Sequence, residues 1–122
     1  MLPFCAAHGL GFTPFGPLAG GWLAGRYRRG EPAPPGSRMT LRPEPYEHLR
    51  TDRTFDALDR FEHAARERGV EPPALAIAWL LGDPRVTAVV VGPRSPEQLE
   101  PVVDAVAAPL TSAEREEISN CF

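Results

Sequence analysis

Arg94 begins the segment of this sequence whose residue types are best suited to chemistry, because a guanidinium offers a phosphate a planar, permanently charged fork. Ser95, Pro96 and Gln98 follow it as a capping residue, a first-turn proline and a capping-box partner. A helix that starts in this way directs free backbone N–H groups and its positive dipole end towards an anion. The spacing therefore predicts half of a phosphate site; the alternative is that Arg94 is only a solvated charge in an ordinary strand–helix turn.

A run of branched apolar residues precedes this segment. Val86–Val91 carries bulky side chains on both faces, which predicts a parallel strand that is buried on both sides. Gly92 allows the chain after this strand to turn tightly or to come close to a ligand. A second, shorter strand is expected over Gly11–Phe15.

The rest of the regular pattern is helical. An amphipathic helix is expected over Thr51–Arg68, and the next helix, which Pro72 and Pro73 begin, is apolar nearly all round and therefore buried. Three further helices are expected over Leu2–His8, Pro96–Ala107 and Thr111–Asn120, the last of which begins with a capping box of Thr111 and Glu114.

Pro101 does not fit the helix expected over Pro96–Ala107, because beyond the first turn a proline removes a helix hydrogen bond. We expect a kink at this position. The apolar residues of this helix are expected to face inward; they are Leu99, Val102, Val103 and Val106.

Glycine, proline and arginine dominate the long stretch from Gly16 to about Arg50. A loop of this length is unusual in a compact domain, and we expect a helical turn around Trp22–Tyr27 but little fixed structure over Arg28–Pro45. Its basic residues either attract or cover an anionic cofactor, or they are the charges of a solvated loop. They are Arg26, Arg28, Arg29, Arg38 and Arg42.

Alternating strands and helices predict an α/β fold with parallel strands and right-handed crossovers. Two parallel strands cannot make a stable sheet, because both faces need cover and both edges stay open. We therefore expect residues 1–122 to be part of one larger domain.

The composition excludes several classes of function. A net charge of −3 gives no support for binding to nucleic acid or a membrane, and no apolar run is long enough to span a bilayer. Two cysteines near opposite ends are expected to be reduced thiols of a cytoplasmic protein; the alternative is a disulfide that joins the two ends. With three scattered histidines they match no metal-ligand pattern. All 13 basic residues are arginine, so the chain supplies no lysine to any mechanism.

Two motifs in this order resemble the C-terminal part of the aldo-keto reductases. They are PFGPLAGGWLAGRY at Pro14–Tyr27 and, after ALAIAWLL, VTAVVVGPRSPEQLE. The resemblance covers nearly the whole chain. It implies a fragment of a (β/α)₈ TIM barrel that reduces aldehydes and ketones with NADPH, and it makes Gly11–Phe15 and Val86–Val91 the last two barrel strands. Phosphate sites in such barrels form on the loops after strands seven and eight.

The resemblance assigns one half of a cofactor site to the first motif. Phe15 stands where the family has an aromatic ring that stacks on the nicotinamide, although a core aromatic at a strand end is the alternative. Gly16 replaces a usual serine, which removes one hydroxyl contact. Pro17, Leu18 and Gly20 match the segment that wraps the pyrophosphate.

The second motif matches the segment that holds the adenosine and its 2′-phosphate. Its matching residues are Gly92, Arg94, Ser95 and Gln98. Val102 stands where the family usually has an asparagine, which weakens the expected contact with adenine.

No catalytic residue is assigned to this chain. The family's Asp, Tyr, Lys and His lie in the N-terminal half of the barrel, and nothing in the sequence brings Tyr27, Tyr46, His48 and Asp52 together as a substitute. Three hypotheses stay open: part of a reductase that works with the N-terminal half of the barrel, an NADP(H)-binding module without catalysis, or an inactive truncated remnant.

Overall fold

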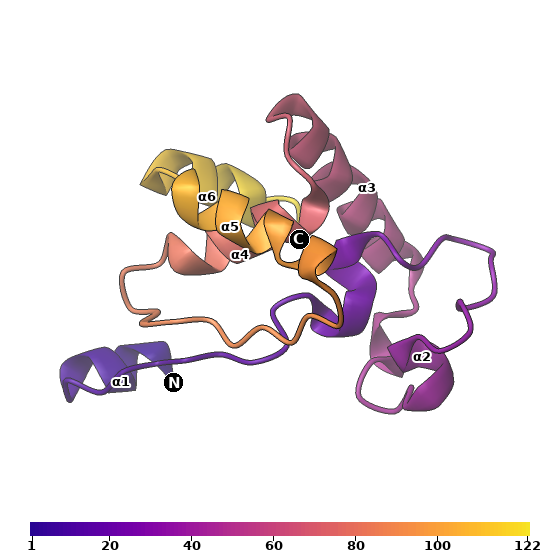
Figure 1. Ribbon diagram of the computed structural model, residues 1–122, viewed down its shortest axis with the longest axis horizontal. Helices are drawn as coiled ribbons and strands as arrows, with labels where there is room; N and C mark the ends of the chain where they lie inside the picture. Colours follow the sequence, from indigo (N-terminus) through magenta and orange to yellow (C-terminus); the bar gives the residue numbers. More distant parts are fainter.

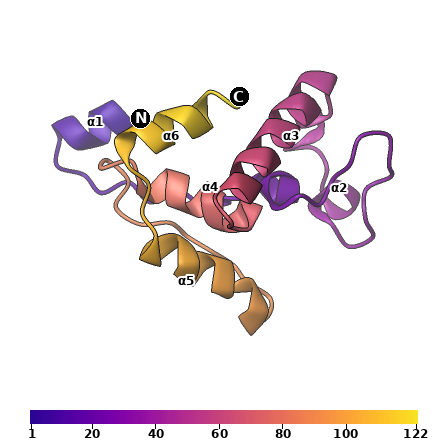
Figure 2. The same cartoon turned by 90° about the horizontal axis from the view of Figure 1, so that it is seen from above.

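The computed structural model describes residues 1–122 and is mainly helical. Helix α4 (Pro72–Leu81) lies in the middle of the molecule (Figure 1), between α5 (Glu100–Ala107) and α6 (Ser112–Ser119) when seen from above (Figure 2). Helix α3 (Asp52–Glu67) meets one end of α4. The remaining elements are short: α1 (Leu2–Ala7), α2 (Arg38–Leu41) and the 3₁₀ turns η1 (Ala19–Ala24), η2 (Glu47–Leu49) and η3 (Pro96–Gln98).

Helices α3 and α4 confirm the predictions from the apolar pattern. Thr51 caps α3 by accepting a hydrogen bond from the backbone N–H of Thr54 at 3.2 Å, and Gly69 follows the helix with a φ of +65°. Pro72 lies in the first turn of α4, where a missing N–H costs nothing. The five consecutive residues Ala74–Ala78 are buried, as expected of a helix that is apolar on all sides.

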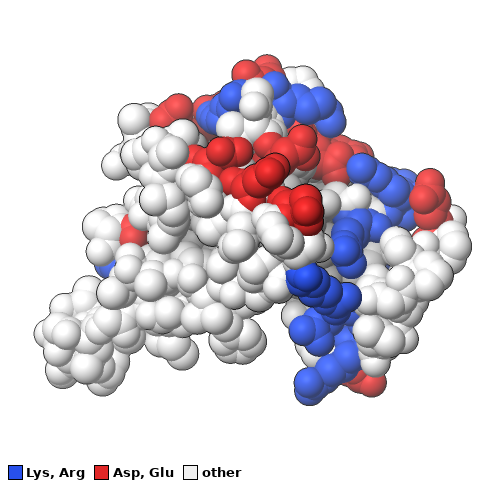
Figure 3. All heavy atoms as spheres, in the orientation of Figure 1, with Lys and Arg blue, Asp and Glu red and all other residues white.

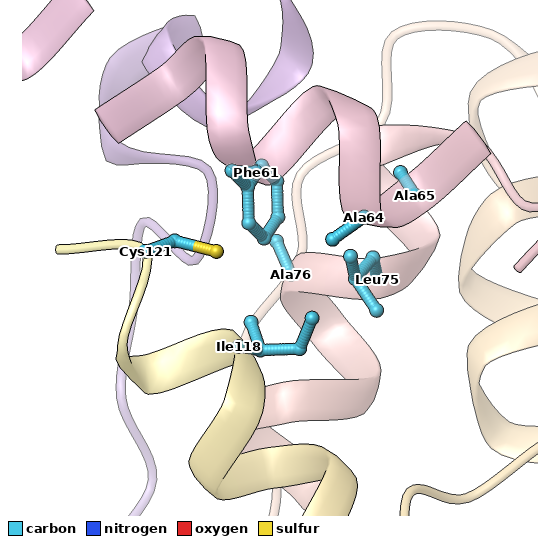
Figure 4. Close-up of a cluster of buried hydrophobic side chains, with 7 residues drawn as sticks. All are labelled: Phe61, Ala64, Ala65, Leu75, Ala76, Ile118 and Cys121. Carbon is cyan, nitrogen blue, oxygen red and sulfur yellow. The ribbon is translucent and has the colours of Figure 1, made fainter. Parts of the chain in front are cut away.

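A core forms where α3, α4 and the C-terminal segment meet. Figure 4 shows its seven side chains, from Phe61, Ala64, Ala65, Leu75, Ala76, Ile118 and Cys121. Burying an apolar side chain of the size of Phe61 or Ile118 contributes about 1.5–3 kcal/mol, so this cluster is a main source of stability. Both cysteines are free thiols, and Cys121 is buried here.

The helix predicted over Pro96–Ala107 is broken rather than kinked. The short turn η3 ends at Gln98, and α5 begins at Glu100 with Pro101 in its first turn, the position in a helix that tolerates proline. The predicted inward face is also wrong in part, because α4 covers only one side of α5. Val102 and Ala105 face α4, whereas Leu99, Val103 and Val106 are 41%, 64% and 64% exposed.

Residues 11–15 and 86–91 run side by side in the same direction, but they form much less strand than predicted (Figure 1). The backbone N–H of Thr87 donates to the carbonyl of Phe12 at 2.8 Å, and that of Val90 donates to Pro14 at 2.9 Å. Phe15 and Val90 make a single parallel bridge. Val90 is 51% exposed, so burial on both faces is wrong as well; no further strand covers or extends the pair. Of the predicted α/β fold, the structure therefore contains the helices and a single parallel bridge, but no sheet.

The loop over Arg28–Pro45 has more fixed structure than predicted. Ser37 and Met39, at the start of α2, are buried, and Met39 packs with Trp22 and Leu58. Ion pairs hold the loop against α3: Arg28 pairs with Glu62 at 2.8 Å, and Arg29 pairs with two aspartates, Asp52 and Asp56. These contacts fix a segment whose composition alone predicts disorder.

A buried carboxylate joins the end of α4 to α6. Asp83 is 1% exposed, and its side chain accepts hydrogen bonds from Arg85 at 2.6 Å and from Arg115 at 3.0 Å. The hydrogen bonds from Arg85 come first among the causes that hold the pKa of Asp83 well below its usual range, and the charge of Arg115 adds to them. Arg115 also donates to the carbonyl of Trp79 and lies over its ring, 4.7 Å from the centroid.

Candidate functional site

The two predicted halves of the site lie at the same end of the paired segments. Because Phe15 and Val90 bridge each other in parallel, the chain continues from both into turns at the carboxyl end of the pair. One turn runs over Gly16–Gly21 and the other over Gly92–Gln98. The fold thus brings together two motifs that lie far apart in the sequence.

The first turn exposes an aromatic ring and an open backbone. Phe15 is 88% exposed, so it is not a core aromatic in this structure, and its ring is free to stack on a planar group. Gly16 has a φ of +65°, and no atom lies within 4 Å of the position that a Cβ would take there. The two residues after it, Pro17 and Leu18, are half-buried, and Leu18 packs against the core around Phe61.

A run of left-handed backbone follows. The φ angles of Ala19, Gly20 and Gly21 are +48°, +67° and +105°. A residue with a Cβ pays about 1 kcal/mol in this region, so Ala19 is strained, and such strain persists only where surrounding contacts hold it.

Two tyrosines of the long loop supply those contacts. The hydroxyl of Tyr27 donates to the carbonyl oxygen of Gly20 at 2.9 Å and accepts from the backbone N–H of Met39 at 3.4 Å. The ring of Tyr46 lies so close to Gly20 that a Cβ there would be 2.7 Å from two ring carbons. Sequence reasoning missed this arrangement: it expected no contact between the tyrosines, and the concentration of aromatic residues at Trp22, Tyr27 and Tyr46 was the available signal.

Arg94 in the second turn is exposed and has no partner for its guanidinium within the chain. Its backbone N–H donates to the side-chain oxygen of Gln98 at 2.8 Å, which leaves the amide nitrogen of Gln98 free to donate. The free donors therefore comprise a full guanidinium fork beside a side-chain amide. This set suits a phosphate next to a polar base or sugar.

The predicted capping box at this turn is wrong. Ser95 stands at the N-cap and Pro96 in the first turn, but the hydroxyl of Ser95 makes no capping hydrogen bond. The Ser95 hydroxyl instead donates to Glu97, which lowers the pKa of that carboxyl. Because η3 is a single turn, its dipole is small, and the charge of Arg94 is the main attraction for an anion here.

The basic residues of the long loop divide into two groups. Arg28 and Arg29 are used in the ion pairs with α3, whereas the side chains of Arg26, Arg38 and Arg42 have no partner. Figure 3 shows a continuous run of arginine atoms between α2 and an almost uncharged surface over α1 and the paired segments. The loop is therefore neither a wholly solvated segment nor a wholly free basic cluster.

Comparison with known proteins decides the family. The model of the family described as "Aldo/keto reductase family" matches residues 1–122, the whole chain. This chain belongs to the aldo/keto reductase family. The resemblance on the two motifs is thus confirmed.

Several curated proteins are similar to this chain in sequence. The chain is 34% identical over 106 residues to the uncharacterized oxidoreductase YrpG of Bacillus subtilis, covering 87% of this chain and 30% of that protein. It is 36% identical to the L-glyceraldehyde 3-phosphate reductase of Escherichia coli K12, covering 81% and 29%. It is also 36% identical to a probable voltage-gated potassium channel subunit beta of Oryza sativa, covering 80% and 30%.

The solved structure of a glycerol dehydrogenase from Gluconobacter oxydans is similar to this chain with a TM-score of 0.77 and 27% identity. The match covers 99% of this chain and 36% of that one. The chain therefore spans about a third of the length of the relatives it matches.

Two of the four residues that were considered as a substitute catalytic group bind other residues of the chain. The hydroxyl of Tyr27 donates to Gly20, and Asp52 pairs with Arg29. A hollow of about 400 Å³ between α3 and α6, lined in part by His63 and Cys121, contains none of the residues of the two turns. No three His, Cys, Asp or Glu side chains are grouped to hold a metal ion, and none of the helices is long and apolar enough to cross a membrane.

Proposed function

We propose that this chain is the C-terminal, cofactor-holding part of an NADPH-dependent aldo-keto reductase, a cytoplasmic oxidoreductase of aldehydes and ketones. The observation that carries the proposal is the parallel bridge between Phe15 and Val90, because it joins two turns of complementary chemistry at one edge. One turn has open left-handed backbone beside a free ring, and the other has a guanidinium without a protein partner.

Each residue has a role towards NADPH in this proposal. The ring of Phe15 stacks on the nicotinamide, and the backbone of Gly16, Pro17, Leu18 and Gly20 wraps the pyrophosphate. The second turn, with Gly92, Arg94, Ser95 and Gln98, holds the adenosine. Arg94 recognises the 2′-phosphate through a charge-assisted fork.

When bound, NADPH supplies a hydride to the carbonyl carbon of the substrate. The acid that protonates the carbonyl oxygen comes from outside these 122 residues, because the chain has no lysine to lower the pKa of a tyrosine. The partner in this proposal is the N-terminal part of the (β/α)₈ barrel. Exposed apolar side chains along α1 and the paired segments, including Phe4, Leu10 and Val90, support a surface that such a partner covers.

A second candidate is an NADP(H)-binding module without catalysis, which the absence of lysine favours. A turnover assay on a simple aldehyde, with and without an N-terminal barrel segment, separates the two. Turnover only after addition of that segment supports the reductase, and binding without turnover in both cases supports the module. Turnover by this chain alone contradicts both.

Titration with NADPH, followed by its fluorescence, tests the shared part of the proposal. Arg94→Ala removes the phosphate contact and is expected to weaken binding about tenfold or more, since a hydrogen bond to a charged group is worth about 1.5–3 kcal/mol. Arg66→Ala is the matched control, because Arg66 is an exposed arginine on α3. Equal affinity of Arg94→Ala and the wild-type chain would overturn the assignment of Arg94.

A further inference from the structure

The Gly16–Gly21 turn, which the proposed function assigns to the pyrophosphate, contacts two tyrosines of the long loop at Gly20. Ala19, Gly20 and Gly21 all have positive φ, a backbone shape that is costly for Ala19. Within the turn, the N–H of Ala19 donates to Gly16 and that of Gly21 donates to Leu18, both at 2.9 Å. Two local hydrogen bonds do not by themselves select this strained shape over a relaxed one.

Tyr27 contributes a specific polar contact. It is 6% exposed. Its hydroxyl donates one hydrogen bond to the carbonyl of Gly20 and accepts another from the backbone N–H of Met39. Removing the hydroxyl leaves the partly buried carbonyl of Gly20 without this partner, which destabilises the observed turn.

Tyr46 contributes shape. Its ring occupies the space next to Gly20 where a side chain would otherwise project, with two ring carbons 2.7 Å from the ideal Cβ position. A glycine is therefore required here for two reasons, its positive φ and the ring.

Both tyrosines pack within the cluster of Trp22, Met39 and Leu58, which includes a residue of α3. The ring of Tyr27 packs against Trp22 with centroids 4.8 Å apart, and Trp22 packs against Phe55 of α3 at 5.6 Å. The ion pair of Arg28 with Glu62 attaches the same loop to α3. A continuous set of contacts thus runs from α3 through the loop to the turn.

We propose that Tyr27 and Tyr46 are positioning residues for the cofactor, holding the Gly16–Gly21 turn in the left-handed shape that receives the pyrophosphate. This inference rests on the proposed function. It assigns the long loop a role as a support behind the cofactor turn.

Amide hydrogen exchange and NADPH titration on the full chain test this inference together. Tyr27→Phe is expected to speed exchange at Ala19 and Gly21 about tenfold and to weaken NADPH binding several-fold. Trp79→Phe is the control: it removes the indole N–H that donates to Arg115 and Ser119 of α6, so the hydrogen bonds that it loses do not involve the turn. It is expected to leave both readouts unchanged.

A double-mutant cycle isolates Tyr46. Gly20→Ala places a methyl group against the ring of Tyr46, so its cost in NADPH affinity is expected to fall at least threefold in a Tyr46→Ala background, where the ring is absent. Strictly additive effects would contradict the packing role of Tyr46.

The outcomes separate this inference from the proposed function. Unchanged exchange at Ala19 and Gly21 in Tyr27→Phe overturns the inference whatever the binding data show. Unchanged NADPH affinity in Tyr27→Phe, with a loss in Arg94→Ala, overturns the positioning role alone. No binding of NADPH by the wild-type chain overturns the proposed function, and exchange then still decides whether the tyrosines hold the turn.

Discussion

The helical core and the paired segments differ in how much of their apolar surface they bury. Phe61 and Ile77 in the core are each 2% exposed, whereas Phe15 at the end of the paired segments is 88% exposed and Val90 is 51% exposed. The core is closed by its own helices, α3, α4 and α6. The paired segments carry the candidate site but lack a second layer. The main core and the proposed cofactor site therefore lie in different regions of the same chain.

Replacing one phenylalanine by alanine in each region is expected to give the largest difference in the free energy of unfolding. Phe61→Ala is expected to lower the free energy of unfolding by about 3–5 kcal/mol, because it leaves a cavity among α3, α4 and α6. Phe15→Ala is expected to change it by less than about 0.5 kcal/mol, because the ring is exposed. Urea unfolding of both variants measures this difference, and similar losses would show that the site region is part of the same core.

Removing the buried charge of Asp83 is expected to lower the free energy of unfolding by less than Phe61→Ala does, and the loss is expected to depend on pH. Asp83→Asn is expected to cost about 2 kcal/mol at neutral pH, because it weakens the hydrogen bonds with Arg85 and Arg115. The pKa of Asp83 is lower in the folded chain than in the unfolded one. Its contribution is therefore complete above about pH 4 and is lost as the pH falls through the folded pKa.

Urea unfolding of wild type and Asp83→Asn from pH 7 to pH 2 checks this prediction. The difference between the two is expected to shrink below about pH 4. A difference that stays constant over the whole range would mean that ionised Asp83 contributes nothing specific.

The strained residue at the site predicts an effect of the opposite sign. Ala19→Gly removes the cost of a Cβ at positive φ but adds freedom to the unfolded chain, so it is expected to raise the free energy of unfolding by about 0.5 kcal/mol. A matched Ala65→Gly change in α3 is expected to lower it by about 1 kcal/mol or more. A loss of stability in Ala19→Gly would contradict local strain at the turn.

The smallest expected effect concerns charge at the second turn. Glu97 accepts a hydrogen bond from Ser95 beside Arg94 and places a negative charge near the proposed phosphate. Glu97→Gln is expected to tighten NADPH binding about twofold at low salt, because exposed charges interact weakly. Glu116→Gln on α6 is the control, and an equal gain there would indicate a general charge effect.

The sequence predicts the helices well because their apolar periodicity and caps are local features. Helix α3 begins and ends within one residue of the predicted Thr51–Arg68, and the predicted capping box of Thr111 with Glu114 begins α6. The strands are predicted poorly, since Val86–Val91 needs neighbours to become a buried strand and only residues 11–15 pair with it. The apolar pattern indicates that a segment favours a strand, but the strand forms only where neighbouring strands pair with it.

In the candidate site, too, local features are easier to predict from the sequence than features that depend on distant contacts. The guanidinium of Arg94 has no protein partner and the turn at Gly16 is open, but the cofactor roles of both residues stay predictions; the capping role predicted for Ser95 is wrong. The composition of the loop suggests disorder, so it does not predict the support of Gly20 by Tyr27 and Tyr46; the aromatic residues of the loop are the one local signal for these contacts. Long-range packing of aromatic residues overrides that composition here.

Discrimination by the 2′-phosphate tests the central claim most directly. Calorimetric titration of the wild-type chain with adenosine 2′,5′-bisphosphate and with adenosine 5′-monophosphate compares ligands that differ by that phosphate alone. The bisphosphate is expected to bind about tenfold or more tightly, and Arg94→Ala is expected to abolish the difference. Equal affinities in the wild-type chain, or a preference that survives Arg94→Ala, would contradict the assignment of Gly92–Gln98 as a 2′-phosphate site.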